Sequence, residues 1–120
     1  MLGFNVNDDL VPFTDLILQG IKTIETRNRN TLKSIIGEPV GLIKTSKKNK
    51  ALLVGSVKLS DPIIYKTEKQ FKQDFEKHRI KDCNLYGFKN GIKYGYPVKV
   101  LKVFKTPKQV QSFGIVLRKI

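Results

Sequence analysis

The chain has 120 residues and a formal net charge of +13, from 23 basic and 10 acidic residues. Its single cysteine, Cys83, and its single histidine, His78, exclude an intramolecular disulfide and every zinc site built from several Cys and His ligands. No apolar run is long enough to span a membrane, and acids stand where a secretory signal carries basic residues. We therefore expect one cytoplasmic domain, residues 1–120, that needs no metal or cofactor.

The first part of the chain predicts a strand, a helix and a second strand. Residues 1–6 are typical of a short strand, and residues 22–27 of another. Between them, residues 10–19 predict a helix with apolar residues three and four positions apart. The ends of this helix are marked by Asp8 or Asp9 as the N-cap, Pro12 in the first turn and Gly20 after the last turn.

The middle of the chain predicts a hairpin followed by a helix. Residues 40–45 and 51–59 are apolar runs rich in β-branched side chains, and the segment SKKNK between them predicts a hairpin with a basic tip. Residues 67–78 then predict a helix in which Thr67 and Gln70 form a capping box.

The last part of the chain predicts the remaining strands. Asn90-Gly91 is a type I′ hairpin signal. Residues 97–105 predict a strand that Pro107 ends, and residues 113–120 predict a closing strand. Strands and helices do not alternate as βαβ units. The sequence therefore predicts an α+β fold, a small mixed β-barrel of about six strands with two or three flanking helices.

The stretch GIKTIETR, residues 20–27, gathers three ionisable residues among β-forming ones. On a regular strand Glu25 and Arg27 share a face, and Lys22 directly follows the glycine, so its side chain can leave the alternation and reach the same place. A surface Glu–Arg pair contributes only about 0–1 kcal/mol. A lysine beside a carboxylate in a dry site could instead orient a water, hold a phosphate or act as a base. The residues alone leave both interpretations open.

Gly20, Lys22, Glu25 and Arg27 follow a G-x-K-x-x-E-x-R pattern that resembles the hallmark of the ASCH domain family (activating-signal-cointegrator homology), relatives of the PUA RNA-binding fold. The segments IIGEPVGLIKT, ALLVGSVKL and YPVKVLKVFKTP are similar to later parts of that family, so the resemblance spans most of the chain, although only the motif is specific. It implies a PUA-like barrel with a cleft whose floor holds the motif residues.

The resemblance also implies binding of RNA or nucleotides, with enzymatic activity in some members. One branch has threonine at the position of Glu25 and uses it, activated by the motif lysine, to deacetylate N4-acetylcytidine. Here Thr23 and Thr26 flank that position without matching it, and a carboxylate is a poor substitute for an activated hydroxyl in amide hydrolysis. Other members are reported as ribonucleases, and such an activity would use Lys22 and Glu25 as catalytic residues and Arg27 to neutralise phosphate.

Basic and aromatic residues predict further contacts with nucleic acid. Lysines at the hairpin tip are expected to contact phosphates, and arginines next to the motif to rim the cleft. Glycine-spaced aromatic residues favour stacking on bases, with Tyr94 or Tyr96 as candidates and Phe88 expected in the core. The expected nucleic-acid-binding residues are Lys22, Arg27, Arg29, Lys44, Lys47, Lys48, Tyr94 and Tyr96.

Three functions follow from these patterns. The first is an RNA- or nucleotide-binding domain that binds phosphates through a basic cleft around the motif. The second is a hydrolase that acts on RNA or modified nucleosides through Lys22 and Glu25. The third is an adaptor for an acidic protein, since charge does not distinguish such a partner from RNA. We expect no membrane partner, a helix-end role for His78 and a buried or incidental thiol at Cys83, and the oligomeric state stays open.

Overall fold

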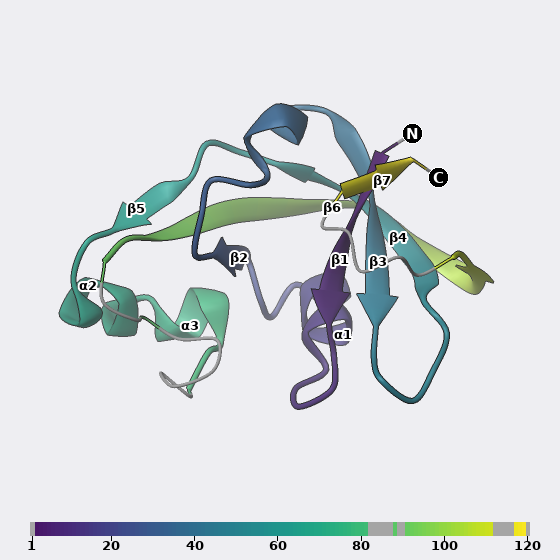
Figure 1. Cartoon of the computed structure of the whole chain (residues 1–120), viewed down its shortest axis with the longest axis horizontal. Coiled ribbons are helices and arrows are strands. Elements are labelled where there is room, and N and C mark those ends of the chain that lie inside the picture. The colour runs from purple at the N-terminus through teal and green to yellow at the C-terminus, as the bar shows by residue number, and fades with distance from the viewer. Residues whose placement is uncertain (1, 82–87, 89–90, 112–116, 120) are drawn as a thin grey trace.

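The computed structural model describes residues 2–81, 88, 91–111 and 117–119. In chain order its elements are β1 (Leu2–Asn7), α1 (Phe13–Leu18), β2 (Ile24–Arg27), a short 3-10 helix (Lys33–Ile35), β3 (Pro39–Thr45), β4 (Leu52–Leu59), β5 (Ile63–Tyr65), α2 (Glu68–Gln73), α3 (Phe75–His78), β6 (Lys93–Gln109) and β7 (Leu117–Lys119). The strands curl into a half-barrel with short flanking helices, which confirms the α+β, barrel-like prediction (Figure 1).

The sheet is organised around the long strand β6. Six strands follow one another in the order β2-β6-β4-β3-β1-β7, and β5 pairs with β6 beside this path. The first part of β6 pairs with β2 and β5, whereas the part from Val98 to Gln109 pairs with β4. The pair β1–β3 is parallel and the others are antiparallel. The strand β6 thus connects the helical end of the molecule with the β3–β4 hairpin (Figure 1).

The main core lies on the inner face of the half-barrel. Its buried residues come from β1, β3, β4 and β6 and include Phe4, Leu42, Val57 and Tyr96. The helix α1 covers this face with Phe13 and Ile17, and α2 contributes Phe71. A second, smaller cluster on the other face of the sheet consists of Ile43, Ala51 and Leu53, with Phe104 and Val110 packed against it.

The helix predicted over residues 10–19 is shorter, and its start differs from the expectation. Pro12, rather than Asp8 or Asp9, is the N-cap residue. Asp8 still acts on the helix from outside, because its carboxylate accepts hydrogen bonds from Thr14 N at 3.1 Å and Thr14 Oγ1 at 2.5 Å. Gly20 follows the C-cap with φ of 77°, as predicted, since a left-handed residue suits glycine.

The helix predicted over residues 67–78 is divided in two. Thr67 caps α2 and its Oγ1 accepts from Gln70 N at 3.1 Å, as expected, whereas the Gln70 side chain accepts from Lys66 N instead of from Thr67. The helix is interrupted at Asp74, which lies between α2 and α3. The helix α3 ends at His78, and the next residue, Arg79, has a left-handed backbone conformation. No described helix is long and apolar enough to cross a membrane.

The strand β6 continues through Pro107, which the sequence predicts as its end. The β4–β6 register skips from Val103 to Lys108 between Gly55 and Leu53, so the proline lies in an irregular stretch where the ladder needs no N–H from it. Asn90, predicted to form a hairpin turn, and Cys83 lie outside the described residues.

Candidate functional site

The strand β2 presents Glu25 and Arg27 on the inner face of the half-barrel. In the antiparallel β2–β6 register, Glu25 lies opposite Tyr96 and Arg27 opposite Tyr94, and directly opposed residues project to the same face. The Arg27 guanidinium carbon lies 5.8 Å from the centroid of the Phe4 ring, which belongs to the main core. The motif side chains on β2 therefore point inward rather than to the outer surface.

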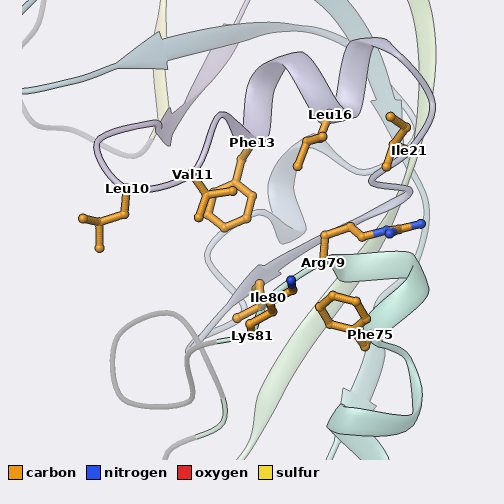
Figure 2. A pocket seen from close by; sticks show the side chains of 9 residues that line it. All are labelled: Leu10, Val11, Phe13, Leu16, Ile21, Phe75, Arg79, Ile80 and Lys81. Carbon is orange, nitrogen blue, oxygen red and sulfur yellow. The ribbon is translucent and has the colours of Figure 1, made fainter.

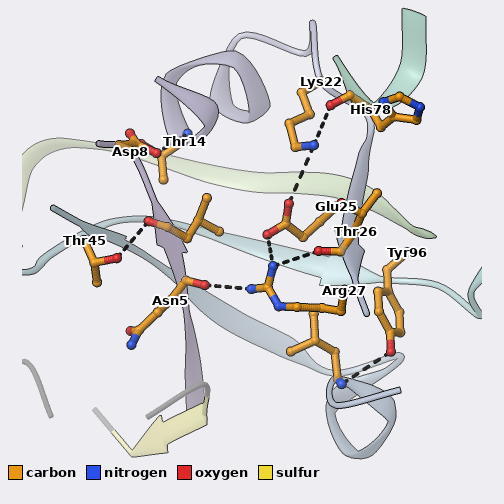
Figure 3. A network of polar contacts seen from close by, with 12 residues as sticks. Asn5, Asp8, Thr14, Lys22, Glu25, Thr26, Arg27, Thr45, His78 and Tyr96 are labelled. Carbon is orange, nitrogen blue, oxygen red and sulfur yellow. Dashed lines mark hydrogen bonds and ion pairs between the residues drawn. The ribbon is translucent and has the colours of Figure 1, made fainter. Parts of the chain in front are cut away.

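Lys22 precedes β2, yet its side chain joins the same group, as expected for a residue released from the strand alternation (Figure 3). Its Nζ lies 3.6 Å from Glu25 Oε1 and donates a hydrogen bond of 2.6 Å to the carbonyl oxygen of His78. The same Nζ lies 4.8 Å from the centroid of the Phe13 ring. Because only 1 % of Lys22 is exposed, this is a buried ammonium rather than one on an open cleft floor.

Burial and charge act in opposite directions on the two buried members of the group. Burial lowers the pKa of Lys22 from 10.5 to about 8, against the opposing attraction of Glu25. Burial also disfavours the ionised form of Glu25, but Arg27 and Lys22 outweigh it and hold the pKa of this carboxyl below its ordinary 4.5. At neutral pH the group thus carries two positive charges and one negative charge.

Arg27 is held in place by three hydrogen bonds and is the most exposed of the three side chains. Its Nη1 donates to Glu25 Oε2 and to the Thr26 carbonyl oxygen, and its Nη2 donates to the Asn5 carbonyl oxygen at 2.7 Å (Figure 3). A guanidinium has five N–H donors, so two remain without an acceptor among the described residues. The side chain is 20 % exposed, so part of it reaches the surface.

His78 is a buried structural residue that supports Lys22. Its Nδ1 accepts from Ile80 N at 3.0 Å, so the proton is on Nε2, which donates to the Phe71 carbonyl oxygen at 2.7 Å. The ring stacks on Phe71 with centroids 4.0 Å apart. Burial lowers the pKa of His78, although the bond to Phe71 opposes this. The helix-end position matches the sequence prediction, and the ring there is buried.

The two tyrosines predicted to stack on bases have different environments. Tyr96 is fully buried, and its hydroxyl donates to Asn30 Oδ1 at 2.6 Å and accepts from Leu32 N at 3.4 Å. Its ring is a core element, which corrects its assignment as a stacking residue. Tyr94 is only partly buried, packs against the main core and stands opposite Arg27 in the β2–β6 register.

Of the remaining predicted residues, the lysines at the hairpin tip lie apart from the motif. Lys47 and Lys48 are exposed at the tip of the β3–β4 hairpin, and Lys44 is half-buried on β3. The Asn5 carbonyl that binds Arg27 lies on β1 opposite Ile43, and the tip begins three residues further, roughly 10 Å along the strand. Arg29 is exposed just after β2. The tip lysines are therefore a separate basic surface.

An apolar pocket of about 470 Å³ lies next to Lys22, between the start of α1 and the end of α3 (Figure 2). Phe13, which contacts Lys22, lines it, together with Leu10 and Ile21 on one side and Phe75 on the other. Arg79 and Lys81 bring positive charge to its rim (Figure 2). The sequence contains no signal for this pocket, because its walls are two segments more than 50 positions apart.

Comparison with known proteins leaves the geometry as the main guide to function. The sequence matches no protein-family model and no curated protein. Within the described part of the chain, no three His, Cys, Asp or Glu residues come together as a potential metal site. The backbone carbonyls of Asn5 and His78, which accept hydrogen bonds from Arg27 and Lys22, could not be predicted from the sequence, because every residue type has a backbone carbonyl.

Proposed function

We propose that the chain is an RNA- or nucleotide-binding domain of the ASCH type, which holds a phosphate or a base edge at Arg27. The observation that carries this proposal is the guanidinium of Arg27, which is fixed by three hydrogen bonds, has two N–H donors without an acceptor among the described residues, and belongs to a side chain that is 20 % exposed. A preorganised guanidinium fork loses little entropy when it binds a phosphate or a base edge in bidentate fashion.

The charge of the buried group supports an anionic ligand. Lys22 and Arg27 carry two positive charges against the single negative charge of Glu25. An excess cation in a poorly solvated site is stabilised when an anion approaches, and a phosphate is the abundant anion that matches the guanidinium geometry. Tyr94, on the same face and partly exposed, adds an aromatic surface on which a base can stack.

The test is the binding of uridine monophosphate and of a short oligouridylate, measured by isothermal titration calorimetry. Arg27→Lys keeps the charge but removes the fork, so we expect affinity to fall about tenfold or more. Lys69→Gln, an exposed lysine on α2, is the matched control and should bind as the wild type does. Unchanged affinity in Arg27→Lys would refute the proposed role of Arg27.

A hydrolase acting on RNA or modified nucleosides is the second candidate, and the lowered pKa of Lys22 favours it. An amine with a pKa of about 8 is partly neutral near physiological pH and can accept a proton, as a general base must. Glu25 stays ionised and would orient that amine. Release of product from RNA or N4-acetylcytidine, lost in Lys22→Met with the fold intact, would support this activity; an inactive wild type would exclude it for those substrates.

A further inference from the structure

We infer that the outer face of the β4–β6 strand pair binds the phosphate backbone of a nucleic-acid strand, so that the ligand is a polymer rather than a free nucleotide. This inference deepens the proposed function, since it names the class of ligand, but it concerns residues outside the motif. The face is defined by Lys58 on β4 and by Lys99, Lys102 and Lys108 on β6, which we call the outer lysine face.

The β4–β6 register places these four lysines on one side of the sheet. Lys99 lies opposite Lys58, Lys102 opposite Ser56 and Lys108 opposite Leu53. The neighbours Val98 and Val100 pack against the main core, so Lys99 between them points outward. Leu53 belongs to the small cluster on the outer face, and the lysine opposite it therefore projects to that face as well.

The pairing of Lys58 with Lys99 is unfavourable without an anion. Like charges directly opposite one another on antiparallel strands destabilise the pair, because their Cβ atoms are only about 5 Å apart. Among the described residues, no acidic side chain forms an ion pair with any of the four lysines. Residues 39–60 and 83–120 contain no aspartate or glutamate, so the three central strands carry no internal counter-charge.

The acidic residues lie mostly away from this face: only Glu38, next to the Pro39 that lies opposite Lys58, and Asp61, just beyond β4, are near one of its lysines. Within the described residues they belong to the region around α1, to β2, to the turns flanking β3 and β4, and to α2 and α3. The part of β6 that carries lysines extends away from those helices toward the β3–β4 hairpin (Figure 1). A field of one sign at one end of a protein attracts and orients a polyanion.

The spacing of the lysines fits a polymer. Lys99 and Lys108 lie opposite Lys58 and Leu53, which are five residues apart on β4, so the two lysines are separated by roughly 17 Å along the sheet at the rise of a β-strand. A single phosphate can bridge the directly opposed Lys58 and Lys99, whereas only a strand with a phosphate at every nucleotide reaches all four lysines. The Phe104 ring, 5.7 Å from Lys102 Nζ, adds a partly exposed aromatic edge to the same face.

The experiment compares two variants of equal net charge. The outer-face variant replaces Lys58, Lys99, Lys102 and Lys108 with glutamine. The control variant replaces four exposed lysines at the helical end with glutamine, namely Lys66, Lys69, Lys72 and Lys77. Binding of a fluorescein-labelled oligouridylate of about 16 nucleotides, the upper end of common site sizes, is measured by anisotropy at several salt concentrations. Circular dichroism checks that both variants keep the fold.

We expect the outer-face variant to lose at least about tenfold in affinity and to reduce the slope of log affinity against log salt by roughly 3, because each phosphate contact contributes about 0.7 for a single strand. The control variant should lose much less. Equal losses in both variants would show that only net charge matters, and no loss in either would show that the face is not used; both results overturn the inference. Equal or tighter binding of polyglutamate would mark an acidic-protein surface and overturn it too.

The design separates this inference from the proposed function. Uridine monophosphate reports on Arg27 and should bind the outer-face variant normally. If Arg27→Lys loses the mononucleotide while the outer-face variant keeps the oligonucleotide, the proposed function stands and the outer lysine face is refuted. If Arg27→Lys binds both ligands normally and the outer-face variant loses the oligonucleotide, the outer lysine face stands and the proposed role of Arg27 is refuted.

Discussion

The ammonium of Lys22 lies 3.6 Å from the carboxylate of Glu25 in a place where both side chains are almost completely buried. A buried ion pair is weak evidence for stability, because the loss of hydration offsets much of the attraction between the charges. The lowered pKa of Lys22 indicates that its charged form is held at a net disadvantage. The motif therefore favours a function at some expense of stability, and this can be measured.

Lys22→Met should stabilise the protein at pH 7. The shift of the Lys22 pKa from 10.5 to about 8 corresponds to roughly 3 kcal/mol against the charged form, at about 1.4 kcal/mol for each pH unit. The lost hydrogen bond to the His78 carbonyl offsets about 1 kcal/mol of this. We expect the free energy of unfolding, from urea denaturation, to rise by about 2 kcal/mol, whereas Lys69→Met should leave it unchanged.

The gain from Lys22→Met should also shrink as the pH rises from 8 to 10.5. In this window the folded protein has released the Lys22 proton while the unfolded chain still holds it, so the stability of the wild type increases with pH. Lys22→Met has no amine at this position, so its stability does not show the increase with pH that Lys22 gives the wild type. A difference between the two proteins that stays constant over the window would contradict the lowered pKa.

Glu25→Gln should destabilise the protein strongly, because it leaves the buried Lys22 and the partly buried Arg27 without their shared counter-charge. Loss of one partner of a buried ion pair typically destabilises by about 3–5 kcal/mol. In the double variant with Lys22→Met, one of those cations is gone. The double variant should therefore lose less stability than the sum of the two single effects predicts. Thermal and urea unfolding of the four proteins give this coupling, with exposed Glu38→Gln as the control. Additive effects would exclude the coupling.

Because Glu25 is held ionised in the folded state, we expect acid to reduce the stability of the protein. Its pKa is lowered in the fold, so its contribution to stability is present above 4.5 and is lost as the pH falls below that value. The wild type should lose stability in this range more steeply than Glu25→Gln. Parallel acid titrations of both proteins, followed by circular dichroism, test this.

His78 should titrate below 6.5 and carry its proton on Nε2. It is the only histidine in the chain, so a single set of imidazole signals in a nitrogen-15 NMR titration reports on it. Stability should fall as the pH drops from 6.5, because the unfolded chain takes up a proton that the buried ring resists. An ordinary pKa would contradict the lowering by burial, and a proton on Nδ1 would contradict the hydrogen bond that Nδ1 accepts from Ile80 N.

Tyr94→Leu should weaken the binding of an oligouridylate more than that of uridine monophosphate if the ring stacks on a base of the strand. Loss of one stacking contact reduces the binding free energy by about 1–3 kcal/mol. Tyr94→Phe keeps the ring and should bind as the wild type does. The control Leu101→Ala removes an exposed side chain of β6, and a similar loss there would show that the effect is not one of stacking at Arg27.

Local signals in the sequence predicted the elements that depend on local physics. The apolar runs of β3 and β4, the capping of α2 by Thr67 and the glycine after α1 all follow from residues close together in the chain. The passage of β6 through Pro107 was missed, since it depends on the register with β4. The break at Asp74 was missed as well, because Tyr65 binds its carboxylate from another element at 2.6 Å.

The sequence by itself determined the excess of positive charge, the acid-free segments and the spacing of Lys22, Glu25 and Arg27. Only the tertiary structure decided that Lys22 is buried against Phe13 and bonded to the His78 carbonyl, and that two Arg27 donors have no acceptor among the described residues. It also decided that Tyr96 belongs to the core while Tyr94 is only partly buried. The physical reason is that burial, and with it the state of a charge, depends on atoms from distant segments. A pattern along one segment carries no record of them.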